Sequence, residues 1–529
     1  MWPQPLAPLG SLELSAIAAV LPLAVVLVLM GIFRKGSLLA SGCGLATTLI
    51  LAVSVWGMPV PLAGWSLAYG FATALWSILW LVFNALWLYN VSIHVGSFDH
   101  LRRWIEQHAS GDPCIQAILV AFCFGALLEG SAGFGAPVAI TAFLLVGLGH
   151  SPRQAVLVSL IANTAPVAFG GVGVPIVALS SVTGLDVMAL SAAVGRQLPL
   201  LSILLPGYLA IIVGGWQGLR VMWPVALVAG ASFALTQFIV SNLWGPYSTD
   251  ILSALASIVA TVAFLKLRPP AQRTMRDSAT GGAGLPWREV IAGWIPWAAL
   301  SFIIVIWVSW LGLPARGQMD VLVPRLHHGV LISLYQTPYS ARFSFQPLST
   351  GTAVLGTTLL IAMWFRVRPR VLLGSGLTAL RQLRLPGIAV MFIVGLAYLY
   401  NSSGMVYTLA TTVAGVGAVF PLLSSYLGWV ACFVTGSDTS SNLLFGNLQV
   451  AAARQLDLSP VLLAATNSSG GVAGKMISPQ NISVGVSTVG LIGQEGQVLR
   501  ATFWHSVLFA GLIGLVSLAQ AYVFRWMVP

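Results

Sequence analysis

Residues 128–137 read Leu-Glu-Gly-Ser-Ala-Gly-Phe-Gly-Ala-Pro, and they interrupt an apolar stretch that extends from 115 to 148. Three glycines and a proline within eight positions would break a continuous helix. In a bilayer, the backbone groups freed by such a break need protein partners or water. The stretch 115–148 is therefore predicted to form a re-entrant hairpin, whose tip at 129–137 lines a polar cavity.

The composition of the whole chain places this hairpin in a membrane. Hydrophobic residues make up 57% of the 529 positions and charged residues only 7%, whereas a soluble domain carries about 25% charged residues. A lipid-facing surface needs almost no charges. The net charge of +11 comes from small groups of Lys and Arg between apolar stretches, as in cytoplasmic loops. Lipid is the expected surroundings, and no nucleic-acid partner is expected.

Apolar stretches long enough to cross a hydrocarbon core of ~30 Å recur along the chain. Basic residues place the connections at 34–35, 91–114 and 268–289 inside, and 314–348 is expected to be an external loop. An even number of crossings must then separate 114 from 268, so 115–148 has to enter and leave by one face. The uninterrupted candidate spans are 12–33, 36–58, 66–90, 187–215, 221–241, 250–267, 290–313, 349–365 and 501–524.

The two halves of the chain repeat the same order of elements. In residues 1–267, the hairpin 115–148 precedes a broken helix at 154–182. In residues 290–529, a second hairpin at 419–453 precedes a broken helix at 459–491. Asn163 and Asn467 are each followed by Gly after seven residues and by Pro after twelve. We predict an all-α polytopic membrane protein with about 12 crossings, two re-entrant hairpins and an inverted repeat, joined by the cytoplasmic loop 268–289.

Four charged residues are predicted at membrane depth: Glu129, Arg196, Asp438 and Lys475. Each costs about 2.5–3.5 kcal/mol at a helix centre, so such residues must face a cavity or each other. Two buried ion pairs that only fix helix packing are the structural alternative. The functional interpretation is favoured because three of the four residues lie in breaks rich in Gly, Ser and Asn. No metal, nucleotide or nucleophile motif is present, so neither a cofactor nor an enzymatic activity is expected.

Four segments resemble the lactate permease family: LLEGSAGFGAPVAI (127–140), VGRQLP (194–199), GSDTSSNLLFGNLQ (436–449) and NSSGGVAGKMISPQNI (467–482). Ser131, Ala136 and Leu443 depart from the family pattern without removing a charge. The resemblance implies a secondary transporter that imports L-lactate, often also D-lactate and glycolate, by proton symport across a bacterial inner membrane. It also implies a fold like that of the ion transporter superfamily, with an elevator-like motion of the hairpins.

On this basis we predict a site in which Lys475 or Arg196 pairs with the substrate carboxylate and Glu129 or Asp438 takes the coupled proton. The other predicted substrate-binding residues are Gly133, Gly135, Asn163, Ser437, Thr439, Ser440, Asn442, Asn467 and Ser468. A sodium-coupled carrier of another small carboxylate is the nearest alternative, followed by a passive anion channel. A membrane-embedded enzyme or sensor is the rival from another class. A homodimer is considered as the assembly, although the sequence does not determine it.

Overall fold

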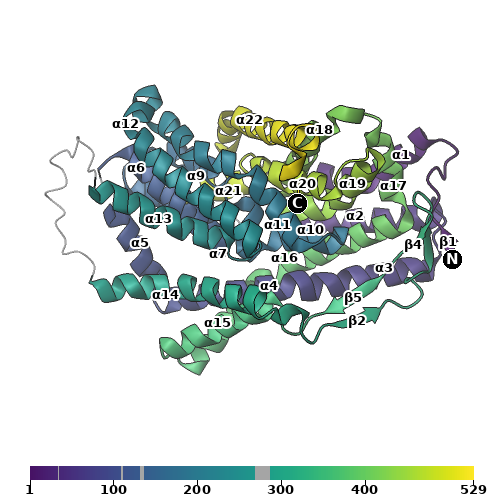
Figure 1. Ribbon diagram of the computed structural model, residues 1–529, viewed down its shortest axis with the longest axis horizontal. Helices are drawn as coiled ribbons and strands as arrows, with labels where there is room; N and C mark the ends of the chain where they lie inside the picture. The colour runs from purple at the N-terminus through teal and green to yellow at the C-terminus, as the bar shows by residue number, and fades with distance from the viewer. Residues whose placement is uncertain (34, 109–110, 132–135, 268–285, 492) are drawn as a thin grey trace.

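The computed structural model describes residues 1–529 apart from 34, 109–110, 132–135, 268–285 and 492. The molecule is an elongated helical bundle in which many helices follow the long axis (Figure 1). Helix α5 (Ser97–His108) and the start of α14 (Trp287–Ile304) lie at one end of this axis. The N-terminus and the strands lie at the other end. Helix α5, from the predicted cytoplasmic connection 91–114, and the strands of the predicted external loop are therefore at opposite ends.

The helices of the first half lead up to the predicted cytoplasmic loop. They are α1 (Leu12–Gly31), α2 (Ser37–Ser54), α3 (Val60–Thr73), the π-helix η1 (Ala74–Leu79), α4 (Trp80–His94), α5, α6 (Pro113–Gln116), the π-helix η2 (Ala117–Phe124), α7 (Gly125–Ser131), α8 (Ala136–Gly147), α9 (Pro152–Ala162), η3 (Val167–Phe169), α10 (Gly170–Thr183), α11 (Val187–Gln197), α12 (Pro199–Leu243) and α13 (Thr249–Leu267).

The helices of the second half follow that loop. They are α14, the π-helix η5 (Val305–Trp310), η6 (Leu313–Ala315), α15 (Thr350–Trp364), α16 (Pro369–Ser403), α17 (Met405–Ala414), η7 (Gly417–Val419), α18 (Phe420–Thr435), α19 (Asp438–Gln455), α20 (Pro460–Lys475), α21 (Pro479–Thr488), α22 (Glu495–Tyr522) and η8 (Arg525–Met527).

Within the described residues, ten helices are long and apolar enough to cross a membrane, or eleven if the bent pair α9–α10 is one span. Helix α12 counts once in this number although it has 45 residues. At ~1.5 Å per residue it is more than twice as long as the ~30 Å hydrocarbon core. Its backbone leaves the helical conformation at Gly215 (φ 63°, ψ −163°), between the predicted spans 187–215 and 221–241. The helical membrane fold is confirmed, whereas the number of crossings and the inverted repeat stay predictions.

The predicted external loop contains short strands. Strand β2 (Met319–Leu322) pairs antiparallel with β5 (Arg342–Phe345), and β3 (Val330–Ile332) pairs with β4 (Thr337–Pro338) and with β1 (Trp2–Pro3). The Asp320 carboxylate on β2 accepts hydrogen bonds from Ser344 (2.6 Å) and Gln318 (2.9 Å). The pairing of β1 with β3 fixes the N-terminus beside this loop, some 330 positions away in the chain.

Glycines allow α18 and α20 to cross with their backbones in contact. A Cβ atom at Gly428 would lie 1.9 Å from the carbonyl oxygen of Asn467, and one at Gly470 would lie 2.2 Å from that of Ser425. Such close crossings are typical of membrane helices, where small residues replace the hydrophobic effect as the basis of packing. The crossing holds the polar face of α20 rigidly against the rest of the bundle.

Candidate transport site

One cavity is lined by the end of α7 and by three breaks in the helices. These breaks lie at the start of α10, between α18 and α19, and between α20 and α21. The cavity has a volume of about 190 Å³. It is lined by Ser37, Glu129, Val167, Gly170, Gly171, Val174, Pro175, Pro386, Gly436, Ser437, Asp438, Thr439, Lys475, Gln480 and Asn481. A water molecule occupies about 30 Å³ in the liquid, so the space suits several waters or one small organic acid.

The break at the start of α10 has an unusual backbone. Gly171, Val172 and Gly173 all have left-handed φ angles, of 52°, 61° and 77°. A β-branched residue such as Val rarely adopts this conformation, which costs of order 1–3 kcal/mol. At Gly173 a Cβ atom would lie 2.8 Å from the carbonyl oxygen of Pro246, so this position requires glycine. Strain of this kind is typical of functional sites.

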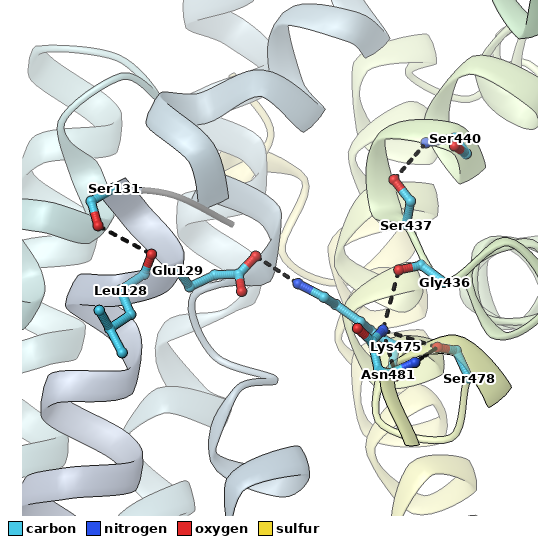
Figure 2. Close-up of polar contacts among 9 residues, drawn as sticks. All are labelled: Leu128, Glu129, Ser131, Gly436, Ser437, Ser440, Lys475, Ser478 and Asn481. Atoms are coloured by element: carbon cyan, nitrogen blue, oxygen red, sulfur yellow. Dashed lines mark hydrogen bonds and ion pairs between the residues drawn. The ribbon is translucent and has the colours of Figure 1, made fainter. Parts of the chain in front are cut away.

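An ion pair crosses the cavity between the two halves of the chain. Lys475 Nζ lies 2.6 Å from Glu129 Oε1, and their side chains are 8% and 4% exposed. Figure 2 shows the two side chains extending toward each other from α7 and from the end of α20. The second carboxylate oxygen of Glu129 has no hydrogen-bond partner among the described residues. Gly170 makes room for the pair, because a Cβ atom there would lie 2.6 Å from Glu129 Oε1.

Asp438 is the second acid of the cavity, and only one of its two carboxyl oxygens is hydrogen-bonded within the described residues. Its Oδ2 accepts hydrogen bonds from Ser468 (2.6 Å) and Asn442 (3.3 Å). Its Oδ1 has no partner within the described residues. That oxygen lies over Gly471, where a Cβ atom would be 2.1 Å away. The free oxygen gives Asp438 the capacity to bind a proton or a substrate hydroxyl.

Two helix N-termini contribute to the cavity wall. Ser437 caps α19, where its Oγ accepts from the Ser440 backbone N–H, and Ser478 caps α21 by accepting from the N–H of Asn481. Figure 2 shows the Ser478 cap beside Lys475 and the Ser437 cap farther from it. The Asn481 side chain donates to the carbonyl oxygen of Gly436 (3.2 Å) and so ties the two breaks together. Free N–H groups and the helix dipole make such N-termini favourable for anions.

Not all of the predicted site residues lie at the cavity. Glu129, Lys475, Ser437, Asp438 and Thr439 line it. Among the others, Gly133 and Gly135 lie outside the described residues.

A polar network lies behind the cavity wall. Asn442 donates to Ser468 (3.1 Å), and Asn467 donates to Asn442 (3.0 Å). Ser440 acts through its backbone at the α19 cap. Asn163 lies close to Lys475 on the opposite side, and its side-chain oxygen is buried without a partner among the described residues. These residues thus support the wall and do not form it.

Arg196 lies apart from the cavity. Its Nε donates to Asn242 Oδ1 (2.8 Å), and a terminal nitrogen donates to the carbonyl oxygen of Met527 (2.9 Å). The guanidinium is only partly buried. These contacts fasten α11 to α12 and to the C-terminus, so the structure gives no support to Arg196 as a ligand of the substrate.

Sequence reasoning overlooked several residues of the site. Gln480 and Asn481 lie in the last break but were not among the predicted binding residues. Ser37 comes from the predicted span 36–58, and Pro386 comes from α16. Sequence reasoning also missed a third buried acid. Asp250 is 1% exposed, although it appeared to mark the outer end of span 250–267. An acid at the end of an apolar run looks like a loop residue unless the packing around it is known.

A second, larger cavity of about 590 Å³ adjoins the first and shares Ser37 and Gln480 with it. Lys35, Glu495 and Met30 also line it. Lys35 belongs to the first connection, which the basic residues place inside. The shared lining connects the site with this predicted cytoplasmic connection.

The sequence model of the L-lactate permease family matches residues 15–524, nearly the whole chain. The chain belongs to this family. The glycolate permease GlcA of Escherichia coli K12 is 42% identical over 99% of both chains. An L-lactate permease of Salmonella typhimurium LT2 is 38% identical over the full length of both chains. The solved structure of MtrF, an antimetabolite efflux pump of Neisseria gonorrhoeae, has a TM-score of 0.51 at 12% identity and covers 94% of this chain and 97% of its own.

These comparisons confirm the resemblance predicted from the four segments. Because the relatives are named permeases, the family member described here is a membrane transporter, as expected, and not an enzyme. The helices and the bacterial relatives together confirm a multi-pass bacterial membrane protein. The likeness to MtrF supports the helical membrane fold alone.

Proposed function

We propose that this L-lactate permease family member carries lactate or glycolate into the cell together with one proton. The names of the relatives, L-lactate permease and glycolate permease, support a small 2-hydroxy monocarboxylate as substrate. The observation that carries the proposal is the buried Glu129–Lys475 pair on the cavity wall. It provides one cation for an anionic substrate and one carboxylate that must be set free when the substrate arrives.

The coupling follows from competition for Lys475. A substrate carboxylate that pairs with Lys475 displaces Glu129, which is then a buried carboxylate without a counter-ion. Breaking a buried ion pair in this way costs several kcal/mol. Protonation of Glu129 removes that cost, so the substrate binds well only when a proton binds too. One anion and one proton then enter together, and the site remains neutral with or without its cargo.

The remaining groups of the cavity suit the rest of the substrate. Backbone N–H groups at the start of α19 and α21 face the carboxylate. Ser437, Thr439 and the free oxygen of Asp438 are available for the 2-hydroxyl group. The larger cavity beside Lys35 provides a way out toward the cytoplasm. An elevator-like movement of the hairpin-bearing part is the motion that would expose the site to the other side.

Transport by protein reconstituted in liposomes tests this proposal. An acidic exterior should drive labelled lactate or glycolate to accumulate inside wild-type liposomes. Glu129→Gln should lose this net uptake, because Lys475 is then charged and unpaired in the empty carrier. The same variant should still exchange labelled for unlabelled substrate, since both legs of exchange carry the anion. Glu13→Gln, at an exposed position on α1, is the matched control.

The outcomes separate the alternatives. Full proton-driven accumulation by Glu129→Gln would refute the coupling role. Accumulation that follows a sodium gradient and ignores the pH step would indicate the sodium-coupled alternative. Substrate that only equilibrates across the membrane would indicate a passive channel.

A further inference from the structure

Asp250 is a buried acid that the mechanism above does not use. It lies in the first turn of α13 and is 1% exposed. Neither of its carboxyl oxygens has a hydrogen-bond partner among the described residues. An ionised carboxylate in that setting would lose its hydration without any compensating contact, which is among the most expensive arrangements in a protein. A neutral carboxylic acid avoids most of that cost.

Asp250 is a neighbour of the transport site. Helix α13 packs against α7, and a Cβ atom at Gly130 would lie 2.7 Å from the Cβ of Asp250. The Asp250 side chain therefore lies against the backbone directly beside Glu129. Glu129 Oε2 is likewise buried and without a partner in the described part of the chain. Three orphaned carboxyl oxygens thus belong to two neighbouring acids.

The charges that act on Asp250 are those of the Glu129–Lys475 ion pair. The other elements packed on α13 are η2, α10, α12 and α14. Their ionisable side chains that the structure describes are Cys123, Tyr208, Arg220, Arg288 and Glu289. None of these five forms a hydrogen bond with the Asp250 carboxyl. With both acids ionised, the cluster has one negative charge more than Lys475 balances, and a single proton removes the excess.

We propose that Asp250 and Glu129 form an electrostatically coupled carboxyl pair, in which Asp250 holds a proton while Glu129 is ionised against Lys475. When a substrate anion takes Lys475, Glu129 binds a second proton from the cavity. The substrate-loaded site then contains two neutral acids, and one proton accompanies each anion. Neighbouring acids of this kind titrate as a unit with two macroscopic steps. This inference rests on the proposed function and adds a second proton to its site.

The pH dependence of lactate binding to the purified protein tests the pair. Substrate binding needs both acids neutral, so at the alkaline end the wild-type affinity should fall about a hundredfold per pH unit. Asp250→Asn keeps the shape of the side chain but removes one proton, so its affinity should fall only about tenfold per unit. Asp186→Asn, at the exposed cap of α11, should behave like the wild type.

Infrared spectroscopy provides a second readout that does not depend on transport. The substrate-free wild type should show the carbonyl band of a protonated carboxylic acid, and Asp250→Asn should lose it. If Asp250→Asn does not reach the membrane, Asp250→Glu is the second variant. It keeps a carboxylic acid at this position, so it should retain both the band and the steep pH dependence of the wild type. An unchanged pH slope together with an unchanged band in Asp250→Asn would overturn the proposal. So would an alkaline affinity restored by sodium ions, because the pair would then hold a cation.

These results remain distinct from the fate of the proposed function. A wild type that neither binds lactate nor responds to a pH step would refute the proposed function itself. A wild type with proton-driven uptake, combined with an Asp250→Asn variant of identical pH dependence, would refute only the carboxyl pair.

Discussion

Replacement of Lys475 by Met removes the only base that lines the cavity among the described residues. The Lys475 Nζ atom lies 2.6 Å from its carboxylate partner, in a pair that is almost fully buried. Hydrogen bonds to charged groups contribute about 1.5–3 kcal/mol, and each 1.4 kcal/mol is about tenfold in affinity. Because so little solvent screens this site, we expect the upper part of that range, a loss of roughly 100-fold in lactate affinity.

The variant is expected to fold. Met fills the space of the lysine stem, and Glu129 can be protonated once its partner is gone. Equilibrium binding of labelled lactate to the purified protein measures the loss, with thermal unfolding as a check on the fold. Lys266→Met, at an exposed position on α13, is the control for the removal of one positive charge. A folded Lys475→Met variant whose affinity stays within about threefold of the wild type would show that lysine is not the anion site.

Two further perturbations act on other parts of the chain. In Gly170→Ala, the new Cβ atom would meet Glu129 Oε1 at 2.6 Å and push that flexible carboxylate away from Lys475. Overpacking costs ~1–3 kcal/mol, so proton-driven uptake should fall roughly 10–100-fold. Gly356→Ala, which has open space around the new Cβ atom, should transport like the wild type. In the predicted external loop, hydrogen bonds, chiefly from Ser344, lower the pKa of Asp320. The contribution of Asp320 to folding is therefore present at neutral pH and is lost as the pH falls through the lowered pKa. Hydrogen exchange of strands β2 and β5, corrected for intrinsic rates, should show acid loosening in the wild type, and Asp320→Asn should show none.

The sequence identifies the parts of the site because its chemistry is conspicuous against an apolar background. Glu129, Asp438 and Lys475 are expensive in a bilayer, and each lies in or beside a run of small or polar residues. Those two signals are local in the sequence, so they were available without a structure. They predicted the breaks, and they also predicted five of the residues that line the cavity.

The sequence could not show which of these parts meet. Glu129 and Lys475 are 346 positions apart, and no local pattern indicates that the end of α20 faces the end of α7. The same limit explains why the sequence did not place Arg196 apart from the cavity, because its partners Asn242 and Met527 lie far along the chain. Asp250 was missed for a related reason, since its burial results from the packing of α13 on Gly130. Pairing and burial are tertiary properties, whereas breaks and charges belong to the chain itself.

The proposed proton coupling follows from the balance of charges buried in the site. Within the described structure, Lys475 is near three buried acids, Glu129, Asp250 and Asp438. Arg196 cannot help to neutralise them, because it is bound elsewhere. Lys475 balances one negative charge. An arriving anion that pairs with Lys475 therefore leaves a buried carboxylate without a counter-ion, and only a proton or a cation can neutralise that carboxylate. A substitution that leaves both Glu129 and Lys475 in place should therefore preserve coupling, even where it weakens substrate binding.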